Sequence, residues 1–178
     1  MSREIIRNTT KNLLKTSLLE LLEKKTLSKI TIKELCEKAD INRTTYYKYY
    51  LDQYDQLDKI ENEIFNDMSI YIESISDDNI KDNEKQNYIL RSVLIYMKEN
   101  QKEFKILLEK ADINFQTKCL SFMGKKVFQN IKYKDKNKEI EYIYKAVGSF
   151  GIIVEWIKDN LDLGIDELTK ILINLNNK

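Results

Sequence analysis

The feature that most restricts the fold of this chain is its shortage of turn-forming residues: its 178 residues contain no Pro and only four Gly. Tight hairpin turns depend on such residues, so the chain is poorly suited to a many-stranded sheet. A content of 42% hydrophobic and 33% charged residues is ordinary for a globular protein and too apolar for disorder. The composition therefore predicts an all-α fold, built as a helix bundle.

Apolar residues recur at helical spacing along most of the chain, which predicts about nine helices. The first is expected over residues 3–25, followed by two short helices at about 32–39 and 43–49 and a long one from Asp52 to about Ile75. Later helices are expected at about 80–99, 101–110, 112–131, 139–159 and 165–177, with residues 77–79 as a loop and 132–138 as a connection.

The segment ITIKELCEKADINRTTYYKYYLDQYDQL, residues 30–57, carries the most informative local signals. Thr31 with Glu34 three residues later predicts a capping box, and Asn42 predicts a second cap. Asp40 lies in the turn between the two short helices and tolerates a left-handed backbone there. Two short helices joined by a three-residue turn, the second rich in Arg, Thr, Tyr and Lys, indicate a helix-turn-helix that enters the major groove of DNA.

Charge is distributed unevenly, although the net charge is only +1. Residues 1–50 hold eleven Lys and Arg against six Asp and Glu, whereas residues 51–178 hold nineteen against twenty-three. A basic N-terminal segment followed by an acidic remainder is typical of a protein that binds phosphate through that segment. The alternative is that the asymmetry arises by chance from charges on solvated faces.

The amphipathic first helix, the T-x-x-x-L-C pattern from Thr31 to Cys36 and the aromatic-rich helix after Asn42 resemble the DNA-binding domain of the TetR family of regulators. The resemblance covers residues 5–60. A second stretch, GSFGIIVEW followed by DELTKIL, resembles the last two helices of a Firmicutes-like group with a GxxGxxxxW penultimate helix. Two departures are Asp40 at the usual turn glycine and Thr44 where glycine is common.

The resemblance implies a helix-turn-helix DNA-binding domain at residues 1–50, with the motif at about 31–49, and a helical dimerisation and ligand-binding domain at 51–178. It places Arg43 and Thr44 at base edges, where Arg can grip guanine through two hydrogen bonds. Tyr46 and Tyr50 are expected to be buried. The full set of predicted DNA-binding residues is Thr31, Asn42, Arg43, Thr44, Thr45, Tyr47, Lys48 and Tyr49.

A homodimer is expected, because short reading helices bind weakly alone and pair across adjacent turns of the major groove. An apolar stripe on the penultimate helix, from Ile140 through Phe150 to Ile157, contains two glycines that permit close helix approach. The predicted interface residues are Ile143, Val147, Gly148, Gly151, Val154, Leu168, Ile171 and Leu172. The alternative is that both helices face only the core of their own chain.

A pocket for a small hydrophobic ligand is also predicted among the middle helices. Its expected lining is aromatic: Tyr71, Tyr88, Tyr96, Phe104 and Phe122, with Phe115 nearby. Aromatic residues at helical spacing more often belong to a plain core, which is the alternative. No metal or cofactor is expected, because the chain lacks His and its two Cys, Cys36 and Cys119, are not in a metal-ligand spacing.

The resulting prediction is a cytoplasmic regulator, a repressor, that binds a palindromic operator as a homodimer and is released by a small molecule. An enzyme is not expected, because the chain has no histidine base, no phosphate-binding glycine loop and no nucleophile elbow. A membrane-surface role for residues 3–25 is not expected, because that helix carries both signs of charge. The remaining alternative is a protein-interaction module on the same fold that does not bind DNA.

Overall fold

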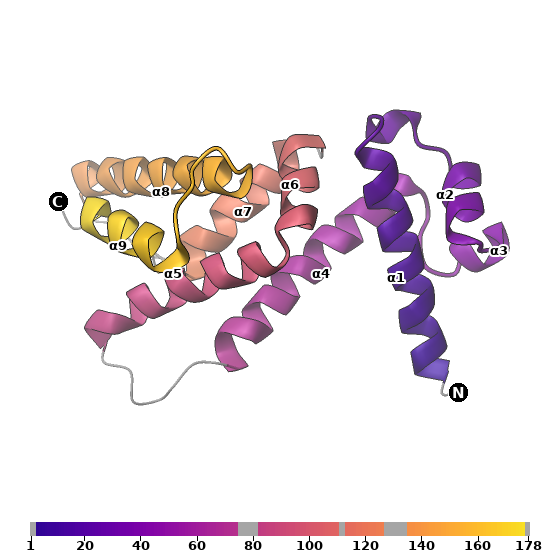
Figure 1. Cartoon of the computed structure of the whole chain (residues 1–178), viewed down its shortest axis with the longest axis horizontal. Helices are drawn as coiled ribbons and strands as arrows, with labels where there is room; N and C mark the ends of the chain where they lie inside the picture. Colours follow the sequence, from indigo (N-terminus) through magenta and orange to yellow (C-terminus); the bar gives the residue numbers. More distant parts are fainter. Residues whose placement is uncertain (1–2, 75–81, 111–112, 127–134, 177–178) are drawn as a thin grey trace. The chain divides into compact units, whose positions relative to one another are not determined.

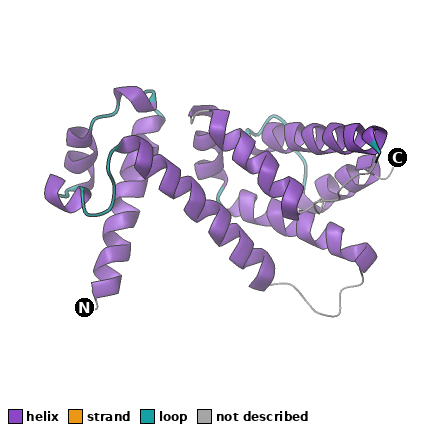
Figure 2. Cartoon of the chain, turned by 180° about the vertical axis from the view of Figure 1, so that it is seen from behind, coloured by secondary structure: helices purple, strands orange, loops and turns teal. Residues whose placement is uncertain are grey.

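The computed structural model describes residues 3–74, 82–110, 113–126 and 135–176 (Figure 1). Within these ranges the regular elements are nine α-helices and one 3-10 turn, with no strand (Figure 2). The all-α prediction is confirmed. The elements are α1 (Arg3–Leu22), η1 (Leu27–Lys29), α2 (Ile32–Ala39), α3 (Arg43–Tyr46), α4 (Gln53–Ser74), α5 (Asp82–Glu99), α6 (Gln101–Lys110), α7 (Ile113–Lys126), α8 (Lys136–Ile157) and α9 (Ile165–Asn176).

Most helix boundaries lie close to their predicted positions, with three differences. Helix α1 ends at Leu22, because the N–H groups of Lys24 and Lys25 both turn back to the Leu21 carbonyl and tighten the last turn. Helix α3 stops at Tyr46, and α8 begins three residues before the predicted start. The predicted loop at 77–79, the last five residues of the helix predicted over 112–131, and residues 132–134 of the connection predicted at 132–138 lie outside the described residues. Residues 136–138 of that connection belong to α8.

The chain divides into two compact units. Unit 1 comprises Met1–Phe65 and Ile106–Asp112, and unit 2 comprises Asn66–Lys105 and Ile113–Lys178. Helices α4 and α6 each contribute residues to both units. The functional assignment of residues 1–50 to DNA binding and of 51–178 to dimerisation stays a prediction.

Unit 1 is built on the inner face of α1, where Leu14, Leu18 and Leu22 are fully buried. They pack at the spacing of successive helical turns, so this face of α1 is continuously apolar. Helix α2 packs against α1 and contributes Leu35, which is also fully buried. This core fixes α2 and therefore the turn that follows it.

Unit 2 packs α5 against α9 and α7 against α8. The Trp156 ring of α8 is buried, and its Nε1 donates to the Leu163 carbonyl at 2.8 Å, which ties the α8–α9 connection to the core. Gly124 of α7 permits a close approach to α8, since a Cβ there would lie 2.7 Å from the hydroxyl of Tyr142. None of the helices in the described ranges combines the length and apolarity needed to cross a membrane.

Candidate nucleic-acid interface

Helix α2 begins with the predicted capping box. The Glu34 N–H donates to Thr31 Oγ1 at 3.3 Å, and the Thr31 N–H donates to Glu34 Oε2 at 3.0 Å. Lys25 also donates to the Glu34 carboxylate. The hydrogen bond from Lys25, followed by those from the Thr31 backbone and side chain, lowers the pKa of Glu34 to about 2. The first turn of α2 is therefore held by local bonds that its own sequence supplies.

The turn between α2 and α3 has the predicted left-handed residue: Asp40 has φ 52° and ψ 46°. The Ile41 N–H donates to the Cys36 carbonyl at 2.9 Å, and the Asp40 N–H donates to the Glu37 carbonyl at 3.4 Å. These two bonds form a Schellman motif, which satisfies the last carbonyls of α2 and reverses the chain. An aspartate therefore takes the place that glycine most often occupies in this motif.

Helix α3 is capped by Asn42, whose Oδ1 accepts from the Thr44 N–H at 2.8 Å. The prediction of a helix over 43–49 was too long by three residues, since only Arg43–Tyr46 is α-helical. Residues 47–49 continue as turns, and the Tyr49 and Tyr50 N–H groups both donate to the Tyr46 carbonyl. Tyr46 and Tyr50 are buried, as predicted, at 0% and 3% exposure.

Most of the predicted contact residues lie on the surface of unit 1. Thr31, Asn42, Arg43, Thr44, Tyr47 and Lys48 are exposed, and Thr45 and Tyr49 are half-buried. The Tyr47 ring is 57% exposed and meets the buried Tyr46 ring edge-on, with centroids 5.6 Å apart. Among these residues Thr31 is the least free to contact DNA, because its hydroxyl already donates to Glu34 Oε2 at 2.9 Å.

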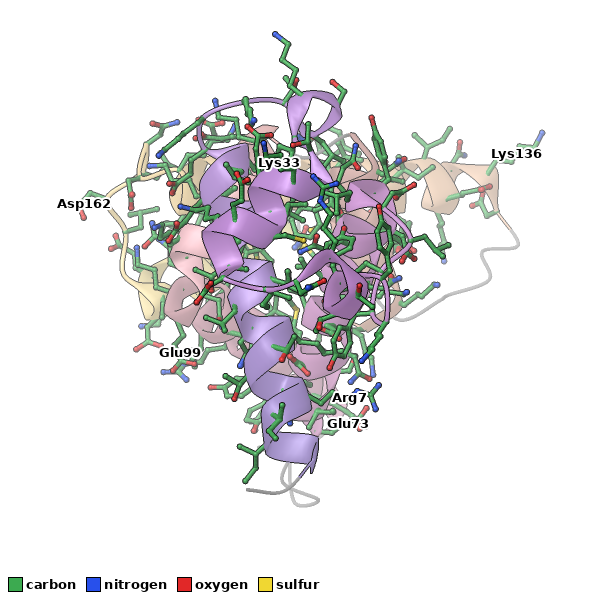
Figure 3. All side chains as sticks on the ribbon, turned by 90° about the vertical axis from the view of Figure 1, so that its right-hand side faces the viewer. Arg7, Lys33, Glu73, Glu99, Lys136 and Asp162 are labelled. Atoms are coloured by element: carbon green, nitrogen blue, oxygen red, sulfur yellow. The ribbon has the colours of Figure 1, made fainter. Side chains whose placement is uncertain are left out.

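The positive charges on this surface that form no ion pair belong to α3 and the turns that follow it. On α2 the exposed lysines are paired, Lys33 with Glu37 and Lys38 with Glu20. Among the described residues no carboxylate pairs with Arg43 or Lys48. Figure 3 shows Lys33 at the surface of this unit. A surface hollow of about 540 Å³ lies between α2 and α3, lined by Lys33 and Arg43 but also by Glu37 and Asp40.

The predicted dimer residues separate into two groups. Ile143, Val147 and Ile171 are 51%, 50% and 37% exposed, and Gly148 and Gly151 are also exposed. Val154 is half-buried, whereas Leu168 and Leu172 are 0% exposed within the single chain and offer no surface to a partner. The apolar stripe expected on α8 is thus two faces, and Phe150 and Ile157 belong to the buried one.

The exposed face of α8 contains one residue that the sequence analysis missed, Tyr144, which is 78% exposed. It lies one helical turn after Ile140, itself 64% exposed, so its helical spacing was the signal available for it. Next to this face, an open groove of about 330 Å³ between α7 and α8 is lined by Leu120, Tyr142 and Val147 among others.

Four of the aromatic residues predicted in or near a ligand pocket pack against one another in unit 2. The ring centroids of Tyr71 and Tyr96 lie 5.7 Å apart, those of Tyr96 and Phe104 6.2 Å, and those of Phe104 and Phe115 6.0 Å. Burial is the main cause that raises the pKa of Tyr96 to about 12. Tyr88 and Phe122 are half-buried. None of the predicted lining residues borders the groove between α7 and α8.

Comparison with known proteins assigns the chain to a family. Residues 84–178 match a TetR-type family described as a transcriptional regulator C-terminal region, which covers more than half of the chain. The chain belongs to the TetR family of transcriptional regulators. Regulators of this family bind DNA and dimerise, and they are in general not enzymes.

A similar fold over nearly the whole chain is found in a solved structure. The solved structure of the dihydroxyacetone kinase operon activator DhaS is similar, with a TM-score of 0.61 and 23% sequence identity over 94% of this chain and 93% of that chain. At this identity the likeness supports the fold alone. A search of curated proteins gives no sequence match.

Proposed function

We propose that this TetR-family regulator binds a palindromic operator as a homodimer, with α2 and α3 as the helix-turn-helix. The observation that carries the proposal is that two cations without an ion-pair partner, Arg43 and Lys48, lie on α3 and the turn after it. The local structure is held by the Thr31 cap of α2, the left-handed Asp40 and the Asn42 cap of α3. Positive donors on a rigidly capped surface meet the requirements of phosphate and base contacts.

The roles proposed for individual side chains follow from their geometry. Arg43 and Thr44 occupy the first turn of α3 and reach base edges, where the Arg43 guanidinium binds guanine O6 and N7. Lys48 and Tyr47, both exposed, bind phosphates and set the register of the protein on the duplex. Thr45 and Tyr49 are half-buried and contribute at the edge of this surface.

The two caps have less freedom to bind DNA. Asn42 Oδ1 accepts the Thr44 N–H, which leaves the Asn42 Nδ2 to donate to a phosphate. The Thr31 hydroxyl donates to Glu34, so a phosphate contact by Thr31 as a donor requires that bond to break. Thr31 therefore serves the proposed function chiefly by fixing the start of α2.

For the dimer we propose the exposed face of α8, Ile143 and Val147 with Gly148 and Gly151, together with Ile171 of α9. Both glycines leave open space, since a Cβ added at either position meets nothing within 4 Å. Flat, small-residue surface flanked by exposed apolar side chains suits close packing of a second copy. A stable interface of this kind needs roughly 800 Å² from each partner.

We propose that the protein acts in the cytoplasm and represses transcription, because a repressor that blocks a promoter needs no contact beyond the DNA itself. The second candidate is activation, favoured by the role of DhaS as an operon activator. A small hydrophobic molecule that binds among the aromatic residues of unit 2 is the proposed release signal. It acts only if it binds one spacing of the two reading helices more tightly than another.

The test is selection of a binding sequence from random duplex DNA by the full-length chain, followed by affinity measurements on the selected and a scrambled duplex over a range of salt concentrations. The proposal requires an enriched palindrome with half-sites about one helical turn, 34–36 Å, apart. It also requires an affinity that falls steeply with salt. A chain that enriches no sequence and binds DNA without salt dependence is the interaction module instead. A promoter–reporter fusion carrying the selected site then separates repression from activation.

A further inference from the structure

Helix α3 is unusually dependent on a single anchor. It has four residues, and Tyr46 is its one buried side chain, at 0% exposure. A helix of one turn has few backbone bonds of its own, so side-chain packing decides its orientation. The direction in which Arg43 and Thr44 point therefore depends on how Tyr46 is held.

Tyr46 is held by a chain of hydrogen bonds that crosses three helices. Its hydroxyl donates to Gln56 Oε1 of α4 at 3.0 Å. The Gln56 Nε2 in turn donates to the backbone carbonyl of Leu14 in α1 at 2.8 Å. Leu14, Tyr46 and Gln56 all belong to unit 1, and Gln56 is 0% exposed.

Burying an amide side chain in a small core costs free energy, because the amide loses its water and both its oxygen and its nitrogen must then form hydrogen bonds. A leucine would fill similar space without needing any partner. The amide makes directional hydrogen bonds. These bonds fix the orientation of the Tyr46 ring relative to α4 more tightly than apolar contacts would. Burial also raises the pKa of Tyr46, so the hydroxyl keeps its proton and remains the donor.

We propose that Gln56 and Tyr46 are positioning residues for DNA reading: the Leu14–Gln56–Tyr46 chain sets the angle of α3 on α1 and α4 and so aims Arg43 and Thr44 at the bases. The proposal rests on the proposed function. Gln56 lies in the first turn of α4, which continues unbroken to Ser74. The hydrogen bond between Gln56 and Tyr46 therefore links the first turn of α4 directly to α3.

The experiment uses the full-length chain and the duplex that it selects from random DNA, with a scrambled duplex as the non-specific probe. Three variants are compared: Tyr46→Phe, Gln56→Leu, and the double variant carrying both. The measured quantity is the ratio of affinities for the selected and scrambled duplexes at one salt concentration. Because a misplaced α3 loses base contacts but keeps phosphate contacts, we expect the ratio to fall about tenfold with little change on scrambled DNA.

Tyr50→Phe is the matched control. It also removes a tyrosine hydroxyl from a buried ring, whose centroid lies 5.5 Å from that of Tyr46. Tyr50 is not part of the hydrogen-bond chain from Tyr46 through Gln56 to Leu14. Its affinity ratio should equal that of the native chain. Circular dichroism and thermal unfolding of every variant establish that binding is measured on folded protein.

The double variant separates positioning from stability. Replacing both partners with apolar groups leaves no buried hydroxyl or amide unsatisfied at positions 46 and 56, so it should unfold at nearly the native temperature while its affinity ratio stays low. If Tyr46→Phe and the double variant keep the native ratio, the chain of bonds is only structural and the proposal is overturned, even if Gln56→Leu alone fails to fold. If the native chain selects no sequence, the proposed function itself fails, and this inference falls with it.

Discussion

Replacement of Asp40 by glycine is expected to stabilise the protein, which is unusual for a single substitution. Asp40 has φ 52° and ψ 46°, a left-handed conformation that costs an L-residue about 1–2 kcal/mol, and somewhat less for Asp. Its carboxylate also lies at the C-terminal end of α2, where a negative charge is unfavourable by about 0.3–1 kcal/mol. Glycine removes both penalties.

The opposing term is the greater backbone freedom of glycine in the unfolded chain, about 0.5–1 kcal/mol. The balance is a net gain of about 1 kcal/mol for Asp40→Gly, which raises the melting temperature by roughly 2–4 °C in a chain of this size. The hydrogen bond from the Ile41 N–H to the Cys36 carbonyl, at 2.9 Å, involves no side chain of residue 40 and should persist.

Two further variants at residue 40 separate the terms. Asp40→Asn removes only the charge and keeps a residue that tolerates the left-handed region, so its gain should be a few tenths of a kcal/mol. Asp40→Ala removes the charge but retains the full conformational penalty, so it should lie at or below the native chain. Urea unfolding at neutral pH, with similar m-values throughout, gives the order of stability. An alanine variant as stable as the glycine variant would refute the assignment of strain to this turn.

Three other outcomes are expected. Arg43→Ala should lose about 1–3 kcal/mol of affinity for a selected operator and relax the preference at one base pair per half-site, and an equal loss on scrambled DNA would make Arg43 a phosphate contact. Because the pKa of Glu34 is lowered to about 2, its stabilising effect is complete above its unfolded pKa near 4.5 and is lost as the pH falls through the folded value. The difference in unfolding free energy between the native chain and Glu34→Gln should therefore shrink as the pH falls from about 5 toward about 2. This change with pH should be smaller in high salt. Gly151→Leu, whose Cβ would meet nothing within 4 Å in its own chain, should weaken dimerisation in sedimentation experiments, whereas Gln86→Leu on an exposed part of α5 should not.

Features that depend on a few neighbouring residues were predictable from the sequence. The capping box of Thr31, the left-handed Asp40 and the Asn42 cap each join residues no more than five positions apart, and all three are present. The error in the length of α3 is also local: residues 47–50 carry the same tyrosine-rich pattern as the helix itself, so nothing in the periodicity marked its end at Tyr46.

The partition of α8 and α9 between core and surface was not predictable in the same way. Leu168 and Ile171 are both aliphatic and close together on α9, yet one is fully buried and the other 37% exposed. Helices α5 and α8 both pack against α9, and Arg91 of α5 pairs with Asp166 in the first turn of α9. Periodicity identifies an apolar helix, but which of its faces is covered depends on elements distant in the sequence.

Gln56 shows the same dependence in its strongest form. The sequence offers no reason to bury it, because an amide beside Leu57 at the start of a long helix is expected to face solvent. Its partners are Tyr46, ten residues earlier, and the Leu14 carbonyl, forty-two residues earlier. Only when α1, α3 and α4 are assembled does a buried amide find both a donor and an acceptor, and only then is α3 fixed. The residues that contact DNA in our proposal can thus be identified from the sequence of α3 and the turns that follow it, whereas the residue that we propose to orient them is defined by tertiary structure.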